Sequence, residues 1–337
     1  MTAQALDVVC IGNALVDILA RTDDGFLREH DIPKGSMTLI DEARALQLYD
    51  AMGPAVEVSG GSAGNTATGV ASLGGKAAFL GKVRNDQLGA IFTHDIRAAG
   101  VAFDVAHARS GPATGRSMIL VTPDAHRSMN TFLGAAVDFG PEDVNEAQVK
   151  AAAVTYMEGY LWDSPSAKAA FHTAARVAHA AGRKISLTLS DPFLVNRYKD
   201  ELKDFVEKHV DIVFANEEEV CSLYDAADFD AALQAVRAHC EVAALTRSEK
   251  GAVIVAGEEV HVVDAAPVGE VVDTTGAGDL FAAGFLYGMT NGHSLYDSGR
   301  IGALAAAEVI SHVGARPEQS LAKLVAVEIG KPRAKRA

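Results

Sequence analysis

The apolar positions along the chain change their spacing from segment to segment, and this spacing predicts the order of strands and helices. From about residue 140, short apolar runs alternate with stretches in which apolar residues recur every three or four positions. The runs predict strands at 152–157, 184–189, 211–214 and 242–246. The periodic stretches predict helices at 166–181, 199–208, 217–224 and 231–239. Alternating units of this kind build a parallel sheet with right-handed crossovers.

The remaining segments extend this sheet and add a smaller unit. Buried strands are predicted at 6–11 and 76–83, a hairpin at 252–256 and 260–263, and helices at 66–73, 86–99, 277–290 and 295–312. A half-exposed strand is also predicted at 101–106, whereas strand-like pieces at 16–20, 37–40 and 117–122 do not follow the strand–helix rhythm. We predict a large α/β domain from residues 1–13, 59–109 and 138–337, and a discontinuous β lid from residues 14–58 and 110–137.

Composition narrows the classes of partner. The formal charge is −14, from 30 Lys and Arg against 44 Asp and Glu, and an acidic surface repels nucleic acids and anionic membranes. The three cysteines are widely spaced and form no CxxC pair, which argues against a disulfide framework or a zinc site. The chain shows no secretory leader and no apolar stretch long enough to span a bilayer. We therefore expect a soluble, cytoplasmic protein, either a monomer or a homodimer.

The segment 273–279 carries the strongest chemical signal. It reads Asp-Thr-Thr-Gly-Ala-Gly-Asp between a β-rich stretch and an apolar-periodic helix. Gly276 and Gly278 let a ligand approach the backbone, and the first amides of the helix favour an anion. Asp279 is then placed to take a proton from an attacking hydroxyl. The alternative is a helix after a glycine turn, in which Asp279 only satisfies backbone amides.

Three further segments could bind a ligand, although each is also explained by ordinary turn and cap chemistry. Residues 59–66 are glycine-rich and end in a helix start with Asn65, which suits polyol hydroxyls. Asn13 and Asp17 follow the first strand and could bind vicinal hydroxyls. Asn216 and Glu219 share a helix face and could hold the waters of a magnesium ion. The chain contains neither a GxxxxGK[ST] motif nor a GxGxxG motif after its first strand.

These segments, in this order, resemble the ribokinase-like (PfkB) family of carbohydrate and nucleoside kinases. The stretch 273–279 is similar to the C-terminal signature of the family, and residues 60–65 are similar to its N-terminal signature. The stretch Asn216-Glu217-Glu218-Glu219 matches its Asn-x-x-Glu magnesium motif. Within the family, residues 12–18, 127–136, 187–193 and 211–216 most resemble the adenosine kinase branch. The resemblance implies a three-layer sandwich with a mostly parallel central sheet and a small β-sheet lid.

The resemblance also implies a role for individual residues. Asp279 would be the catalytic base, with Gly276, Ala277 and Gly278 as the anion hole and Arg127 reaching the phosphates from the lid. Asp17, Asn13, Gly61, Ser62 and Asn65 would bind ribose hydroxyls, and the base would contact Leu15, Leu39, Leu133, Ala135 and Leu161. ATP would lie near Thr246, Ser248 and Gly251, and Mg²⁺ near Asn216 and Glu219. Asp273, Thr275 and Gly314 match a monovalent-cation site that usually holds K⁺ in relatives.

Three residues depart from the pattern of the family. Ser248 stands where relatives often carry Gly, Arg84 stands in the place of another Gly, and Gly64 replaces a larger residue beside Asn65. The last two changes lie in or near the N-terminal signature and therefore bear on the acceptor.

The resulting hypothesis is an ATP-dependent kinase that phosphorylates the 5′-hydroxyl of a nucleoside, with adenosine as the first acceptor to test. The first alternative is a fructokinase- or ribokinase-like sugar kinase of the same fold. The second is a non-catalytic nucleoside-binding regulator, which an intact base and anion hole argue against.

Overall fold

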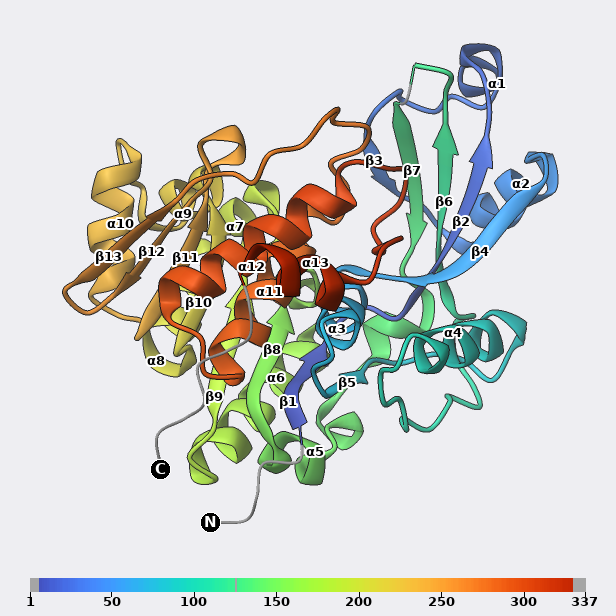
Figure 1. Ribbon diagram of the computed structural model, residues 1–337. Coiled ribbons are helices and arrows are strands. Elements are labelled where there is room, and N and C mark those ends of the chain that lie inside the picture. The colour runs from blue at the N-terminus through green and yellow to red at the C-terminus, as the bar shows by residue number, and fades with distance from the viewer. Residues whose placement is uncertain (1–5, 125, 330–337) are drawn as a thin grey trace.

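An eight-stranded sheet forms the centre of the protein. The structure is a computed structural model and describes residues 6–124 and 126–329. The strands lie in the order β13 (Glu259–Val263), β12 (Ala252–Ala256), β11 (Val242–Thr246), β10 (Ile212–Asn216), β9 (Lys184–Thr188), β8 (Ala152–Glu158), β1 (Leu6–Ile11) and β5 (Ala77–Leu80) (Figure 1). Strands β5 to β11 of this order run parallel, and the β12–β13 hairpin adds an antiparallel edge. The predicted sheet and hairpin are confirmed.

Helices cover both faces of this sheet and complete three layers. One apolar core includes α3 (Ser62–Ser72), α4 (Gln87–Ala98), α11 (Ala277–Thr290), α12 (Leu295–Val309) and α13 (Leu321–Glu328). The other includes α5 (Glu146–Ala151), α6 (Pro165–Ala180), α7 (Pro192–Arg197), α8 (Lys199–His209), α9 (Glu217–Tyr224) and α10 (Phe229–Arg237). Short 3-10 helices cover Gly134–Asp138, Pro141–Asp143, Gly159–Asp163 and Ser248–Lys250.

Strand β1 shows why the sheet is covered on both sides. Val8 and Cys10 belong to the first core, whereas Val9 and Ile11 belong to the second. Successive side chains of a strand point to opposite faces, so a continuous apolar run supplies both cores at once.

A second sheet of five strands stands beside the first. Its order is β3 (Met37–Leu39), β7 (Arg127–Phe132), β6 (Gly115–Val121), β2 (Leu15–Arg21) and β4 (Ala55–Gly60) (Figure 1). The helices α1 (Asp24–Glu29) and α2 (Glu42–Ala51) accompany this sheet, and Ala45 and Leu48 of α2 share a core with Met118 of β6. Residues 117 and 119 of β6 point to the opposite face, which lies over the carboxyl ends of the large sheet.

The structure corrects one predicted strand and adds helices that the pattern missed. Residues 101–106 pair with the sheet only through a bridge between Ala102 and Ala78. Their apolar residues alternate because Val101 and Phe103 are buried in the core, and the segment forms no strand ladder. The unpredicted α1 and α2 begin after Asp23 and Asp41, whose carboxylates accept the amides of the first turn. Among residues 6–124 and 126–329, no helix is long and apolar enough to cross a bilayer.

Candidate active site

A cavity of about 1050 Å³ opens between the inner face of the five-stranded sheet and the carboxyl ends of the parallel strands. Strand β1 leads into Asn13, β8 ends at Glu158 and β10 ends at Asn216, and all three side chains line the cavity. Ligands of open α/β sheets bind beyond these strand ends. The predicted site residues that line it are Asn13, Leu15, Asp17, Leu39, Gly61, Ser62, Asn65, Leu133, Asn216, Glu219, Thr246, Thr275, Gly276, Ala277, Gly278 and Asp279.

The N-terminus of α11 forms the floor of the cavity next to Asp279. Gly276 precedes the helix with φ +80°, and a Cβ on it would lie 2.9 Å from Cα of Ala315, so only glycine fits this turn. The first turn of a helix leaves amides without intrahelical acceptors and carries the positive end of the dipole. This end of α11 therefore suits a phosphate group.

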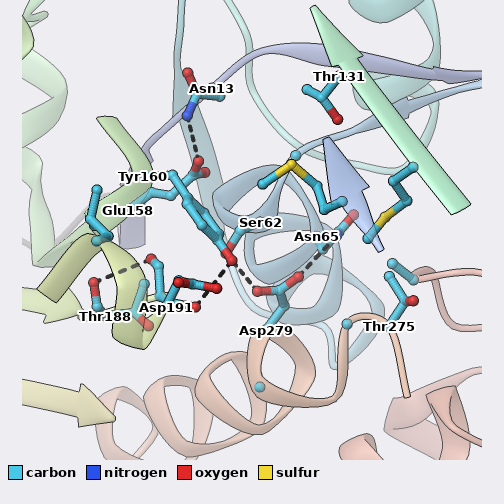
Figure 2. A pocket seen from close by; sticks show the side chains of 18 of the residues that line it. Asn13, Ser62, Asn65, Thr131, Glu158, Tyr160, Thr188, Asp191, Thr275 and Asp279 are labelled. Carbon is cyan, nitrogen blue, oxygen red and sulfur yellow. Dashed lines mark hydrogen bonds between the residues drawn. The ribbon is translucent and has the colours of Figure 1, made fainter. Parts of the chain in front are cut away.

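The carboxylate of Asp279 is held by two side chains of α3. Ser62 Oγ donates to Oδ1 at 2.6 Å, and Asn65 Nδ2 donates to Oδ2 at 2.9 Å (Figure 2). Burial raises the pKa of Asp279, while these two bonds and the charge of Arg316 lower it. The two signatures of the sequence, which lie more than 200 residues apart, thus meet at one carboxylate, and a base fixed in this way can receive a proton from an acceptor hydroxyl.

Glu158 is a site residue that the sequence analysis missed. Its carboxylate accepts a hydrogen bond from Nδ2 of Asn13 at 2.8 Å (Figure 2). It also accepts one from the backbone amide of Ala63 at 2.8 Å. Burial raises its pKa to about 7, against the lowering effect of these two bonds. A Cβ on Gly12 would lie 2.3 Å from Glu158 Oε2, so the glycine makes room for the carboxylate. Its place at the end of a predicted parallel strand was the available signal.

Asp17 reaches the cavity from β2 of the smaller sheet. Burial raises its pKa to about 6; Arg316 and Arg127 oppose this rise, and Asp279 adds to it. A Cβ on Gly60 would lie 2.3 Å from the Asp17 carboxyl group, and Gly61 has φ +86° with no room for a Cβ beside the carbonyl of Asn13. The glycine pair therefore lets the chain pass directly beneath Asp17.

An apolar wall covers the side of the cavity that the smaller sheet supplies. The residues of this wall are Leu15, Met37, Leu39, Ile119, Met129 and Leu133. Ala135 and Leu161, which were expected to contact a base, are buried at 1% and 2% exposure and do not line the cavity. Leu161 packs into the core on the far side of the large sheet, and its neighbour Tyr160 lines the cavity in its place.

Arg127 pairs with Asp273 and does not line the cavity. The guanidinium donates to Oδ2 of Asp273, and both side chains are almost fully buried. The same carboxylate accepts the amides of Thr275 at 3.0 Å and Gly314 at 2.9 Å. The residues expected around a monovalent cation are therefore close together, but their negative charge is already balanced by Arg127.

A second hollow of about 770 Å³ shares Asn216 and Thr246 with the cavity and is also lined by Ser248. Asn216 and Glu219 form a reciprocal cap, in which the amide of Glu219 donates to Asn216 Oδ1 at 2.8 Å and the carboxylate accepts the Asn216 amide at 2.9 Å. Burial raises the pKa of Glu219 to about 7. Gly251 lines neither space; its φ of +81° belongs to the turn between β11 and β12.

Comparison with known proteins places the chain in a family. Residues 46–321 match the model described as pfkB family carbohydrate kinase, and the chain belongs to this family. It is therefore a phosphotransferase whose acceptor is an alcohol.

Individual relatives cover nearly the whole chain. A structure named adenosine kinase from Sinorhizobium meliloti is 56% identical, covers 96% of this chain and 99% of its own, and superposes with a TM-score of 0.89. A probable sugar kinase protein from Rhizobium etli CFN 42 is equally similar, at 56% identity, the same two coverages and a TM-score of 0.90. Adenosine kinase of Saccharomyces cerevisiae is 29% identical over 91% of this chain and 95% of its own.

Proposed function

We propose that the protein transfers the γ-phosphoryl group of ATP to the 5′-hydroxyl of a nucleoside, with adenosine as its acceptor. The observation that carries the proposal is the cavity itself. A hydrogen-bonded carboxylate at the N-terminus of α11 faces a polar end around Asp17 and Asn13 and an apolar wall from the smaller sheet. A ribose fits the polar end, and a heterocyclic base fits the wall.

In the proposed reaction the 5′-hydroxyl oxygen bonds to the γ-phosphorus while the bond from that phosphorus to the bridging oxygen of ADP breaks. Asp279 orients the hydroxyl and accepts its proton, and ADP leaves with the bonding electrons. The amides at Gly276, Ala277 and Gly278 stabilise the charge that develops on the transferred group. The five-stranded sheet would act as a lid, residues 14–58 and 110–137, that excludes water from the reaction.

Magnesium and ATP fit the residues at the other end of the cavity. Asn216 and Glu219 line the cavity beside the hollow that Thr246 and Ser248 line. Each of their side-chain oxygens accepts one hydrogen bond of the reciprocal cap and could accept a second from a water molecule. Oxygen ligands of this kind suit Mg²⁺ through its waters. Bound there, the ion would supply charge neutralisation on the phosphates. Gly251 would act only by setting the turn that carries Ser248.

The proposal includes a dependence of the kinase activity on K⁺. Asp273, Thr275 and Gly314 could serve a monovalent cation only after Arg127 leaves the carboxylate for the phosphates. Initial rates in K⁺, Na⁺ and a bulky organic cation at equal ionic strength measure this dependence. Equal rates in all three would remove the cation site from the proposal.

A sugar kinase of the same fold is the second candidate, since one of the two equally similar structures carries that name. An acceptor screen with ATP and Mg²⁺ separates the two, using adenosine, guanosine, inosine, ribose and fructose. We expect a higher kcat/KM with nucleosides than with free sugars, because six apolar side chains would contact a base but not a free sugar. Among the nucleosides we expect adenosine to be preferred, since relatives of the chain are named adenosine kinases. Preference for ribose or fructose would overturn the nucleoside assignment and keep the kinase.

The cellular compartment and the oligomeric state of the enzyme are also proposed. Its cysteines are free, and Cys10 and Cys240 are buried, which suits a reducing cytoplasm. We expect a monomer or a homodimer, which light scattering after gel filtration distinguishes. Fractionation of the source cells would check the compartment.

A further inference from the structure

Arg316 lies behind the acceptor end of the cavity, against Ser59 and Gly64, and no part of the proposed mechanism uses its charge. Its Nη2 donates to the carbonyl of Ser59 at 2.6 Å and to the Ser59 hydroxyl at 3.1 Å. Ser59 begins the buried part of β4 and directly precedes Gly60, on which a Cβ would lie 2.3 Å from the Asp17 carboxyl group. The Nε of Arg316 is buried and finds no hydrogen-bond partner among the described residues.

The charges of three carboxylates on different elements act on this guanidinium. They are Asp17 on β2, Asp95 on α4 and Asp279 on α11, and their charges oppose the burial that lowers the pKa of Arg316 to about 10. Asp95 is already occupied, because its Oδ2 accepts the amide and the hydroxyl of Ser59. The carboxylates of Asp17 and Asp279 both line the cavity, and the charge of Arg316 lowers the pKa of each.

The chain is built to hold Arg316 in this place. On one side Gly314 donates to Asp273, and on the other the amides of Glu318 and Gln319 donate to the buried Glu308 at 3.0 and 2.9 Å. Gly64 of α3 packs against the guanidinium, since a Cβ on it would make an ordinary contact with Nη2 at 3.5 Å. A side chain longer than alanine at position 64 would therefore meet the guanidinium.

We propose that Arg316 is a positioning residue of the acceptor site, whose guanidinium keeps Asp17 and Asp279 in the ionised form that accepts hydrogen bonds from the acceptor hydroxyls. The inference rests on the proposed function. A protonated carboxyl group could not take the proton of the reacting hydroxyl, and it would offer a donor where the sugar needs an acceptor. Arg127 also lowers the pKa of Asp17, and Asp279 raises the pKa of Glu158, so Arg127 and Glu158 stay unchanged in the test.

The first experiment compares the pH profiles of kcat/KM for the unaltered enzyme, Arg316→Gln and Arg316→Lys. Removing the charge should move the acidic limb up by about one pH unit, so that Arg316→Gln loses about tenfold more activity on the acidic side than on the alkaline side. Arg316→Lys keeps the charge and should restore most of the limb. An equal loss at every pH, or a Lys variant no better than Gln, would show a merely structural role and overturn the proposal.

A second pair of variants acts on the position of the Arg316 guanidinium without replacing Arg316 itself. Gly64→Leu should push the guanidinium away and reproduce the shifted limb, whereas Gly64→Ala, whose Cβ makes an ordinary contact at 3.5 Å, should leave the profile unchanged. This pair also decides the question if Arg316→Gln fails to fold. A Leu variant with the limb of the unaltered enzyme would contradict the proposal.

The role of Arg316 can be tested even if the proposed kinase activity is wrong. If the unaltered protein phosphorylates none of the tested acceptors, the proposed function is wrong. The carboxyl carbon of Asp17, assigned in NMR spectra through Asp17→Asn, then gives the answer without turnover. Its titration midpoint should rise by about one unit in Arg316→Gln. An unchanged midpoint overturns the inference.

Discussion

The two ends of the active-site cavity are built in opposite ways. At the acceptor end, the buried or half-buried charged groups Asp17, Glu158, Asp279 and Arg316 face one another and raise or lower each other's pKa. At the nucleotide end, residues 248–250 are exposed, and Arg247 is already paired with Glu217 at 3.0 Å and stacked over Phe229.

This difference indicates which end of the cavity should be sensitive to substitution. Removing the partner of a buried charge lowers the free energy of unfolding by several kcal/mol, whereas an exposed ion pair contributes about 1 kcal/mol or less to it. Substitutions at the acceptor end should therefore change rate, pH dependence and stability together. Those at the exposed residues 248–250 of the nucleotide end should change little, and the following tests could break this contrast.

The largest effect is expected for Asp279→Asn. The amide keeps the size of the side chain but cannot take a proton, so kcat should fall by about 10³-fold with adenosine and ATP. Asp264→Asn, an exposed carboxylate outside the cavity, is the matched control and should keep the full rate. A kcat for Asp279→Asn within tenfold of the unaltered enzyme would remove Asp279 as the base.

The next effect concerns the free energy of unfolding. Asp273→Asn leaves the buried Arg127 without its counter-charge and should lower the free energy of unfolding by about 3 kcal/mol. Glu146→Gln breaks an exposed pair with Lys150 and should cost less than about 1 kcal/mol. Urea titrations of both variants measure the difference. Equal losses would mean that the Arg127–Asp273 pair contributes no more than a surface pair.

A pH dependence of stability should follow from Glu158. Burial raises its pKa from 4.5 to about 7, so between these values the folded protein binds more protons than the unfolded chain. Stability must then fall as pH rises through this window and stay lower above it. Asp17 and Glu219, whose pKa values are also raised, contribute in the same direction.

Glu158→Gln isolates the contribution of Glu158. From about pH 5 to about pH 8 the unaltered protein should lose about 2 kcal/mol more than this variant. Urea unfolding at both pH values measures the two losses. Parallel losses would show that Glu158 stays ionised in the folded protein throughout.

The smallest effect is expected at the nucleotide end, for Ser248→Gly. Ser248 has φ +53°, a left-handed conformation that glycine adopts without strain, so the variant should gain up to about 1 kcal/mol of stability. KM for ATP should change by less than about threefold, because the serine side chain is exposed. A tenfold rise in KM would show that the hydroxyl binds the nucleotide and would weaken the contrast between the two ends.

Much of this architecture follows from local patterns in the sequence. The strand and helix rhythm after residue 140 predicts the parallel sheet, since both depend on periodic burial that a single segment reveals. The segment 273–279 predicts its own turn and helix start for the same reason, because Gly276 and the first amides of α11 need no distant partner.

Only the tertiary structure decided which residues far apart in the chain meet in space. Sequence spacing could not show that Asp279 meets Ser62 and Asn65, or that Arg127 is taken by Asp273. The exchange of Leu161 for Tyr160 arose because a one-residue step in the 3-10 helix Gly159–Asp163 turns a side chain from core to cavity. Whether a polar side chain is a cap, a base or a buried counter-charge depends on its neighbours in space. For that reason the sequence determined the elements, and the packing of those elements decided the charges around Asp279.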